Sequence, residues 1–321
     1  MIPAYRPGAD YLRSALESVL QQDPGSGQMQ IEVVDDSSPD VDVAALVRTV
    51  AGGRVAFSST SKNLGLAGCW NACIERARGE WVHILHQDDL VRPGFYDGLR
   101  RLIGAHPAAG AAFSRYAYIN AHGDLLAEAE ALQTAAGPIH GAVEVLAVKN
   151  QVQCPAIVVR RAAYKTVGGF DGRYVFGLDW EMWLRLAARF PVLYHPESLA
   201  AFRVNIASET SRLARSGETV HDAMRLIATF PNYLAADRAA AIQTRARHWA
   251  CDVSLQKAGK YLQDRQPQYA MAQLHAVLRY DRRWSSWNTA FGIWARFIKR
   301  NQQWPLPPLP FLPESWFRDK L

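Results

Sequence analysis

The residues best suited to chemistry in this sequence are acids at the ends of apolar segments. The clearest case is the stretch 79–90, in which the apolar run 81–85 leads into Asp88 and Asp89. A buried strand that brings two carboxylates to its C-terminal end offers the oxygen ligands that Mg²⁺ or Mn²⁺ prefers, usually together with substrate phosphates. The alternative is a solvated turn, because Asp is favoured in turns of any protein.

Two further acids stand at comparable places. Asp36 follows the apolar segment 30–34, and Asp179 lies near the start of segment 177–186, whose pattern predicts a helix. An acid in the first turn of a helix can simply interact with the helix dipole, and an acid after a strand can cap the next helix. We expect Asp40, rather than Asp36, to cap the helix that follows.

Histidines and cysteines give no independent metal site. His83 and His86 lie three residues apart, so on a strand they point to opposite faces. Cys69 and Cys73 share one helix face, and with no other ligand nearby we expect them in the core. Four cysteines without a paired pattern also favour a reducing compartment over a disulfide framework.

The elements that position these residues alternate between strand and helix. We expect strands that end at Pro3 and that span 30–34, 54–57 and 81–85, with helices at 10–20, 41–50, 66–77 and 93–103, the first capped by Asp10. This alternation predicts an α/β fold with a doubly wound, mostly parallel sheet. Ligands bind outside the carboxyl ends of such strands. The ends of the first, second and fourth strands, at 3–5, 35–38 and 86–89, should therefore line one crevice.

The pattern changes after about residue 110. We expect short strands at 111–114, 116–120, 154–159, 192–194 and 199–204, with helices at 161–167 and from 177. Residues 216–300 read as four helical segments, and 304–313 as a polyproline-like tail. We therefore predict three parts: a first half of the α/β domain (1–110), a second half (111–212) and a helical extension with a Pro-rich tail (213–321).

Bulk composition excludes several classes. The 321 residues carry a net charge of +6, compatible with anionic ligands or an anionic membrane surface, but no basic run is dense enough for nucleic acid. No apolar run reaches the roughly 18 residues of a spanning helix, and no secretory signal opens the sequence. We therefore expect a cytoplasmic protein.

Several motifs occur here in an order and spacing that is specific together, although each is weak alone. They are Ile2-Pro3-Ala4-Tyr5, Asp35-Asp36-Ser37-Ser38, Asn63-Leu64-Gly65, Asp88-Asp89, Gly168-Gly169-Phe170-Asp171 and Leu178-Asp179-Trp180-Glu181. Over about residues 1–210 the chain resembles the family 2 glycosyltransferases, which have the GT-A fold. The resemblance implies transfer of a sugar from a nucleoside diphosphate to an acceptor, usually with inversion and with Mg²⁺ or Mn²⁺. It makes 1–110 the nucleotide-sugar-binding half and 111–212 the acceptor-binding half. That family also has several apolar residues before the first motif, so we expect the natural chain to begin upstream of Met1 or its first strand to be truncated.

The resemblance places the metal at the family's Asp-x-Asp motif. The last Asp of that motif falls on Asp88, and the first falls on His86. Histidine can still bind a metal or the ribose but adds no negative charge, so metal binding should be weaker or pH-dependent. We predict Asp88 and His86 as ligands, with Asp89 as a supporting acid.

On the nucleotide side, the resemblance assigns Asp36 to the base, where a carboxylate suits the N–H of uracil or thymine. The other nucleotide contacts would come from the first strand end and the turn after the third strand: Pro3, Ala4, Tyr5, Asn63 and Gly65. The family often has Ala-Arg-Asn in the next helix, where this chain has Cys69-Trp70-Asn71. One expected arginine contact is therefore missing.

On the acceptor side, inversion needs a base that takes the proton of the acceptor hydroxyl. The matching position is Asp179, while Leu178 replaces the Glu that usually precedes it and Glu181 is a competing acid. Trp180 is predicted to stack on a sugar, although Trp180 and Trp183 at helical spacing could also be core. Arg203 resembles the family's late basic residue that faces the diphosphate.

The segment 282–300 lies outside the resemblance. Its aromatic and aliphatic residues follow a 3-4-3-4 spacing and share one helix face: Trp284, Trp287, Phe291, Trp294 and Ile298. With basic residues at both ends, such a face suits either peripheral contact with the inner face of a membrane or packing on other helices or a second subunit.

Two other functions fit parts of the sequence. A sugar-1-phosphate nucleotidyltransferase shares the doubly wound layout, but such enzymes open on a Gly-rich phosphate loop, which Pro3-Ala4-Tyr5 is not. A nucleotide-sugar-binding protein without catalysis would explain His86 and Leu178. The main prediction is a glycosyltransferase that uses a UDP- or dTDP-linked sugar and acts on a glycan or a lipid-linked glycan.

Overall fold

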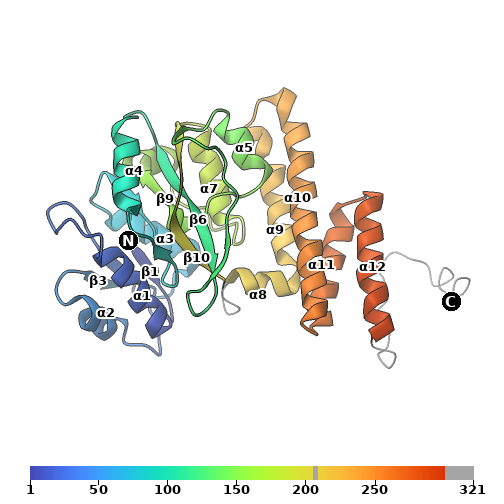
Figure 1. Cartoon of the computed structure of the whole chain (residues 1–321), viewed down its shortest axis with the longest axis horizontal. Helices are drawn as coiled ribbons and strands as arrows, with labels where there is room; N and C mark the ends of the chain where they lie inside the picture. The colour runs from blue at the N-terminus through green and yellow to red at the C-terminus, as the bar shows by residue number, and fades with distance from the viewer. Residues whose placement is uncertain (205–208, 301–321) are drawn as a thin grey trace, which may run out of the picture. The chain divides into compact units, whose positions relative to one another are not determined.

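The computed structural model describes residues 1–204 and 209–300 of the chain. It divides into two compact units, Met1–Ile206 with Pro231–Ala236, and Ala207–Phe230 with Asp237–Leu321. The first is an α/β unit and the second is helical, and Figure 1 shows the elements of each. The predicted division of the first 212 residues into two halves stays a prediction, because strands from both halves share one sheet.

The N-terminal strands form the parallel part of the α/β unit. β1 (Ile2–Ala4), β2 (Glu32–Asp35) and β3 (Ala56–Ser59) pair in that order, with Ala4 opposite Asp35 and Asp35 opposite Ser59. Met1 links them to β4 (Trp81–His83). Its N-terminus donates to the His83 carbonyl at 2.9 Å, and the Leu85 N–H donates to the Met1 carbonyl at 3.0 Å.

A second, mixed sheet continues from β4. Its order is β4-β9-β6-β10-β5, built from β9 (Ile157–Arg160), β6 (Ala111–Ile119), β10 (Val192–Arg203) and β5 (Leu90–Val91). β7 (Leu125–Glu128) pairs with β6, and β8 (Gly137–Pro138) with β10. β6 and β10 run parallel, whereas β9 is antiparallel to both β4 and β6.

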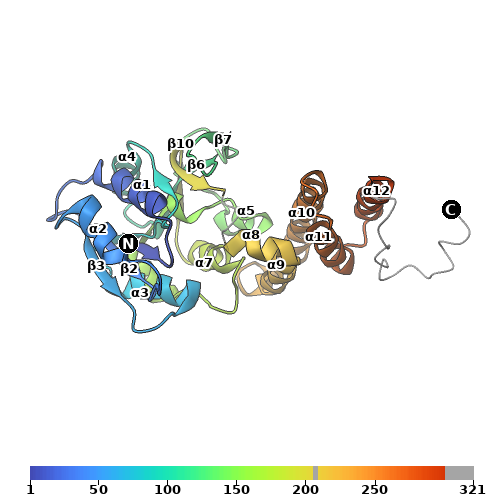
Figure 2. The same ribbon diagram turned by 90° about the horizontal axis from the view of Figure 1, so that it is seen from below.

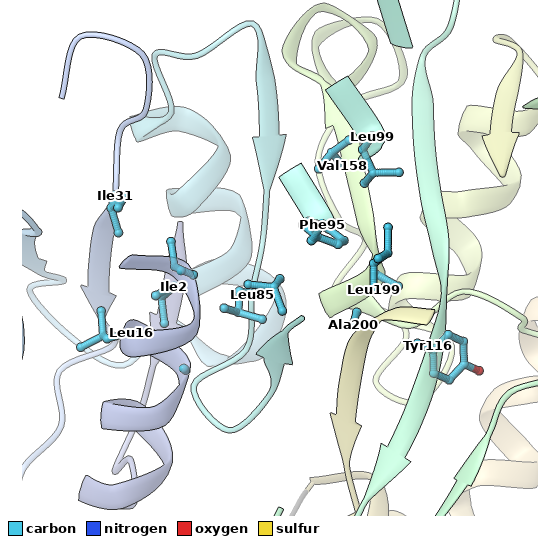
Figure 3. Packing of buried hydrophobic residues seen from close by; sticks show 14 of the residues in the cluster. Ile2, Leu16, Ile31, Leu85, Phe95, Leu99, Tyr116, Val158, Leu199 and Ala200 are labelled. Atoms are coloured by element: carbon cyan, nitrogen blue, oxygen red, sulfur yellow. The ribbon is translucent and has the colours of Figure 1, made fainter. Parts of the chain in front are cut away.

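Helices cover both faces of the parallel strands, as a doubly wound fold requires. Val33 packs in a cluster with α1 (Ala9–Leu20), α2 (Val43–Ala51) and α4 (Phe95–Gly104). Its neighbour Val34 points the other way and packs on Cys69 and Cys73 of α3 (Gly65–Arg76). Figure 2 shows α1 and α3 on opposite sides of β2, and Figure 3 shows the larger cluster, from Leu16 and Leu85 to Phe95 and Leu199.

The remaining helices of the first unit are α5 (Ala142–Val148), α6 (Arg161–Val167) and α7 (Leu178–Ala187). The second unit holds α8 (Glu209–Ser216), α9 (Glu218–Ala228), α10 (Ala236–Gln263), α11 (Pro267–Tyr280) and α12 (Trp284–Arg300). No helix among the described residues is long and apolar enough to cross a membrane. The predicted polyproline tail, 304–313, lies outside the described residues.

Several local predictions were wrong. Gly8, not Asp10, precedes α1, and Asp42, not Asp40, caps α2 by accepting from the Ala45 N–H at 2.8 Å. Asp40 forms an exposed ion pair with Arg6 instead.

Strand boundaries also differ from the predictions. β6 and β10 are each one strand where two were predicted, because a register shift at 195–200 absorbs the irregular residues of β10. The first three residues of the predicted strand 154–159 form a 3₁₀ turn, Cys154–Ala156.

Candidate active site

The carboxyl ends of β1, β2 and β4 are joined by hydrogen bonds at one edge of the sheet. The Tyr5 N–H donates to Gln87 Oε1 at 2.8 Å, and Gln87 Nε2 donates back to the Tyr5 carbonyl at 3.2 Å. The Arg6 N–H donates to Ser38 Oγ at 2.8 Å. The ends of the three strands are therefore adjacent, with Gln87 as a connecting residue that the sequence did not single out, and the crevice between them stays a prediction.

Asp36 organises the turn that begins α3. Its buried carboxylate accepts the N–H groups of Leu64 at 2.8 Å and Gly65 at 3.0 Å. Asn63 closes the turn, since its Oδ1 accepts from the same Gly65 N–H at 3.1 Å and its Nδ2 donates to the Asp36 carbonyl at 3.3 Å. Gly65 has φ +72°, a conformation that favours glycine. The structure thus brings Asp36, Asn63 and Gly65 together, while their contact with a base stays a prediction.

Asp88 stands in the loop after β4, where its carboxylate meets its own backbone N–H. Among the residues that the structure describes, no side chain donates to it, and the contact of the loop with Arg203 goes through the Asp88 carbonyl. Burial, reinforced by the neighbouring Asp89, raises the pKa of Asp88 to about 6. A half-buried carboxylate without a side-chain donor is stabilised by a cation, and this fits the predicted metal position.

His86 does not fit the predicted role of metal ligand. Its Nδ1 lies 3.3 Å from Asp89 Oδ2, and its ring stacks on Trp70 with centroids 4.8 Å apart. Nε2 is buried and has no hydrogen-bond partner among the described residues. Burial alone would lower the pKa of the imidazole, but the nearby Cys154 sulfur and the Asp89 carboxylate raise it well above its usual range. His86 is therefore the partner of Asp89, inside the protein.

Arg203 also differs from its prediction. Its side chain is buried and donates to three carbonyl oxygens, those of Asp88 (2.7 Å), Asn120 (2.9 Å) and Ala121 (3.0 Å). The guanidinium lies over the Tyr11 ring, 4.7 Å from its centroid. These contacts hold the loop after β4 in place, so the predicted contact with the diphosphate is wrong for this geometry.

Asp89 also helps to hold the loop after β4, through contacts with Arg203 and His86. Its Oδ1 accepts the Arg203 N–H at 2.8 Å, while its Oδ2 faces His86. Asp89 is almost fully buried, so its carboxylate stabilises the loop from inside the protein. Of the two acids, only Asp88 is accessible to a ligand.

Asp179 lies in the first turn of α7. Asn150 Nδ2 donates to its Oδ1 at 3.1 Å, and the Trp180 N–H donates to the same oxygen at 2.7 Å. Burial raises the pKa of Asp179 to about 6, although these hydrogen bonds and the His86 charge favour the ionised form. A carboxylate with a pKa near neutrality is suited to take a proton from an acceptor hydroxyl.

The residues after Asp179 face the core. Trp180 is only 1% exposed and donates its Nε1–H to the Leu146 carbonyl at 2.6 Å, so the prediction that it stacks on a sugar is wrong. Trp183 is buried as well, with its Nε1–H on the Val152 carbonyl. Glu181 pairs with Arg185 at 2.7 Å and accepts from the Tyr233 hydroxyl at 2.8 Å, so its carboxylate is already satisfied. Asp179 is the remaining base candidate on this turn.

Asn71 joins α3 to the segment before α7. It donates to the Phe170 carbonyl at 3.0 Å and accepts the Phe170 N–H at 2.7 Å. A side chain on Gly169 would place its Cβ 2.4 Å from Asn71 Oδ1, so glycine is required for this approach. Asn71, Asn150 and Gln87 were missed by sequence reasoning; each is an amide side chain next to a predicted site segment, which is a weak signal.

Comparisons with known proteins agree with this geometry. The profile described as Glycosyl transferase family 2 matches residues 1–130. An uncharacterised protein of Mycobacterium tuberculosis is 31% identical over 249 residues, which cover 70% of this chain and 73% of that protein. The succinoglycan biosynthesis protein ExoO of Rhizobium meliloti is 40% identical over 111 residues, 35% of this chain and 30% of that protein. The crystal structure of S. aureus TarS 1-349 in complex with UDP-GlcNAc aligns with a TM-score of 0.64 at 16% identity, over 95% of this chain and 92% of that one.

Proposed function

The chain belongs to glycosyltransferase family 2 and has the GT-A fold, and from this premise we propose that it moves a sugar from a UDP- or dTDP-type donor to a glycan or lipid-linked glycan, with inversion. The observation that carries the proposal is the placement of two acids whose pKa values burial raises, Asp88 after β4 and Asp179 at the start of α7. The names of the similar proteins support it, since ExoO takes part in succinoglycan biosynthesis and TarS was solved with UDP-GlcNAc.

Asp88 is the residue that would hold Mg²⁺ or Mn²⁺. The described residues contain no group of three or more His, Cys, Asp or Glu side chains that could hold a metal ion. A single carboxylate is still compatible with these ions, which keep several waters and bind largely through substrate phosphates. Such an ion would neutralise the charge that develops on the leaving nucleoside diphosphate.

Asp179 would perform the proton transfer. In an inverting reaction the acceptor oxygen attacks the anomeric carbon, the bond from that carbon to the phosphate oxygen breaks, and the hydroxyl proton passes to Asp179. Asn150 holds one carboxylate oxygen, so the other is left for the acceptor. Gln87 and Arg203 keep the donor-side loop in place during this step.

Donor recognition is the first prediction. UDP- and dTDP-sugars should raise the melting temperature in the presence of Mn²⁺, because a ligand that binds only the folded state stabilises it. ADP- and GDP-sugars serve as controls and should give smaller shifts. The donor that stabilises should also be hydrolysed slowly, faster with Mn²⁺ than without it. Binding without any hydrolysis or transfer would support the non-catalytic alternative, and exchange of pyrophosphate into the donor would support a nucleotidyltransferase.

The exposed side of α12 fits peripheral contact with an anionic membrane. Trp284 is 83% exposed and Phe291 44% exposed, whereas the buried face of the helix is formed by Ser286, Ala290 and Ile293. Of the other predicted members, Trp287 is half-buried, and the side chains of Trp294 and Ile298 lie outside the described residues. Lys and Arg outnumber Asp and Glu by seventeen to nine in the second unit, which favours an anionic surface.

Liposome binding is the second prediction. Co-sedimentation with vesicles that contain anionic lipid should exceed that with neutral vesicles and should weaken at high salt. The double variant Trp284→Ala/Phe291→Ala should lose most of this binding. A matched control, Leu125→Ala/Leu126→Ala, removes exposed apolar surface from β7 instead and should bind as the parent does. Equal binding by the first variant, or no binding by the parent, would favour packing against a second subunit.

A further inference from the structure

Two residues that depart from the family's pattern touch each other. Trp70 stands where the family often has Arg, and His86 stands at the first Asp of the Asp-x-Asp motif. Trp70 comes from α3 and His86 from the loop after β4, and their rings stack with an interplanar angle of 28°. The two residues that differ from the family's pattern are therefore in direct contact.

We propose that Trp70 and His86 are a coupled positioning pair, whose aromatic stack sets the position of Asp88 relative to Asp179. The proposal rests on the proposed function, since it concerns the two acids assigned to that reaction. It identifies Trp70 as a residue that acts on the site through His86 and does not itself touch the donor.

The pair reaches Asp88 through a short chain of contacts. His86 faces Asp89 at 3.3 Å, and Asp89 accepts the Arg203 N–H at 2.8 Å. Arg203 in turn donates to the Asp88 carbonyl. A shift of the His86 ring would therefore displace the loop that carries Asp88.

The pair reaches α7 through Phe170. The Trp70 ring meets Phe170 edge-on at 4.9 Å, and Phe170 meets Trp183 of α7 edge-on at 6.1 Å. Asn71, next to Trp70, binds the backbone of Phe170 through two hydrogen bonds. One residue of α3 thus contacts both the loop of Asp88 and the segment that supports the helix of Asp179.

Trp70 and His86 have buried surroundings, so we expect either Trp70→Arg or His86→Asp alone to destabilise the protein. Trp70 is 4% exposed, so an arginine there would bury a guanidinium beside an imidazole. A carboxylate in place of His86 would lie against the buried carboxylate of Asp89 without a cation between them. Introduced together, the new guanidinium and the new carboxylate neutralise each other.

A double-mutant cycle tests the coupling, and it is the third prediction. The four proteins are the parent, Trp70→Arg, His86→Asp and the double variant Trp70→Arg/His86→Asp. Each single change should lower turnover and the melting temperature. The double variant should retain at least about tenfold more activity than the product of the two single losses. Its affinity for Mn²⁺ in the presence of UDP should likewise exceed the value expected from adding the two single losses.

The readouts separate failure of the inference from failure of the proposed function. Coupling is scored in the unfolding midpoint and in Mn²⁺–UDP calorimetry as well as in transfer, so it is measured even if no acceptor is found. If the losses of stability and of Mn²⁺–UDP binding in the double variant equal the sum of the losses in the two single variants, Trp70 and His86 are not coupled and the inference is wrong. If the two residues are coupled in stability and in Mn²⁺–UDP binding but the protein transfers no sugar from any donor, the proposed function is wrong instead. Trp70→Phe, which keeps a ring on His86, should retain more turnover than Trp70→Leu, and the reverse order would also contradict stacking.

Discussion

Replacement of Asp179 by Asn is expected to lower the turnover number by about 10²–10⁴-fold, the range of a lost general base, and to leave donor affinity near that of the parent. Asn keeps the shape of the side chain and the hydrogen bond from Asn150 needs only an acceptor oxygen, so the fold is retained. Steady-state rates with a saturating donor measure the loss, and calorimetry with UDP measures the affinity. A change confined to the Michaelis constant for the donor would contradict the role of base.

Glu181→Gln is the matched control for this variant. Glu181 lies two residues further on, but its carboxylate is occupied by Arg185 and Tyr233. Its replacement should lower the melting temperature through the broken ion pair and leave turnover within a few-fold of the parent. If Glu181→Gln lowers the turnover number as strongly as Asp179→Asn does, Glu181 must be considered as the base in place of Asp179.

The pH dependence follows from the same residue. The base must be ionised, and burial raises the pKa of Asp179 to about 6, so kcat/KM should rise with pH through about 6 and level off above it. Asn150→Ala removes a hydrogen bond that favours the ionised form, so the rising limb should move to higher pH. Because the folded state raises this pKa, the carboxyl stabilises the protein at low pH and that contribution is lost as pH rises through about 6. The Asn variant at position 179 should therefore gain stability over the parent above pH 6.

The sequence was sufficient for the doubly wound layout because local patterns determine it. Val33 and Val34 alternate between the two helical layers, and the acids follow directly where β2 and β4 end. The positions of Asp88 and Asp179 at strand and helix ends are set by the same local rules. What those residues bind is a separate question that the strand pattern does not answer.

The residues whose roles were predicted wrongly are those whose partners lie far away in the sequence. Arg203 meets Asp88 and Asn120, and no local pattern shows that its Nε and Nη1 would donate to backbone carbonyls. His86 is held by a stack on Trp70 and by Asp89, and only the fold brings Trp70 to it. For Trp180, helical spacing allowed both a core and a surface position. The structure shows that it is a core residue, since its buried Nε1–H donates to the Leu146 carbonyl.

Asp88→Asn is expected to remove metal-dependent turnover while the protein stays folded. The neutral amide keeps the size of the side chain but lacks the charge that a hard divalent cation requires. The Asp88 carboxylate has no donor among the described side chains, so the fold loses no hydrogen bond from it. Burial and Asp89 raise the pKa of Asp88 to about 6, which means that the ionised group weakens the folded state above that pH. The variant should consequently melt at the same temperature as the parent or higher at pH 7–8.

A titration with Mn²⁺ in the presence of UDP distinguishes a ligand from a structural acid. Asp88→Asn should lose the metal-dependent part of UDP binding, and excess Mn²⁺ should not restore turnover. Asp89→Asn is the informative counterpart, because Asp89 holds Arg203 and His86 and is almost fully buried. That change should lower the melting temperature, with activity that recovers in part at lower temperature. If Asp88→Asn still transferred sugar and still required Mn²⁺, the metal would have to be held elsewhere, and Asp89 would be the next acid to consider.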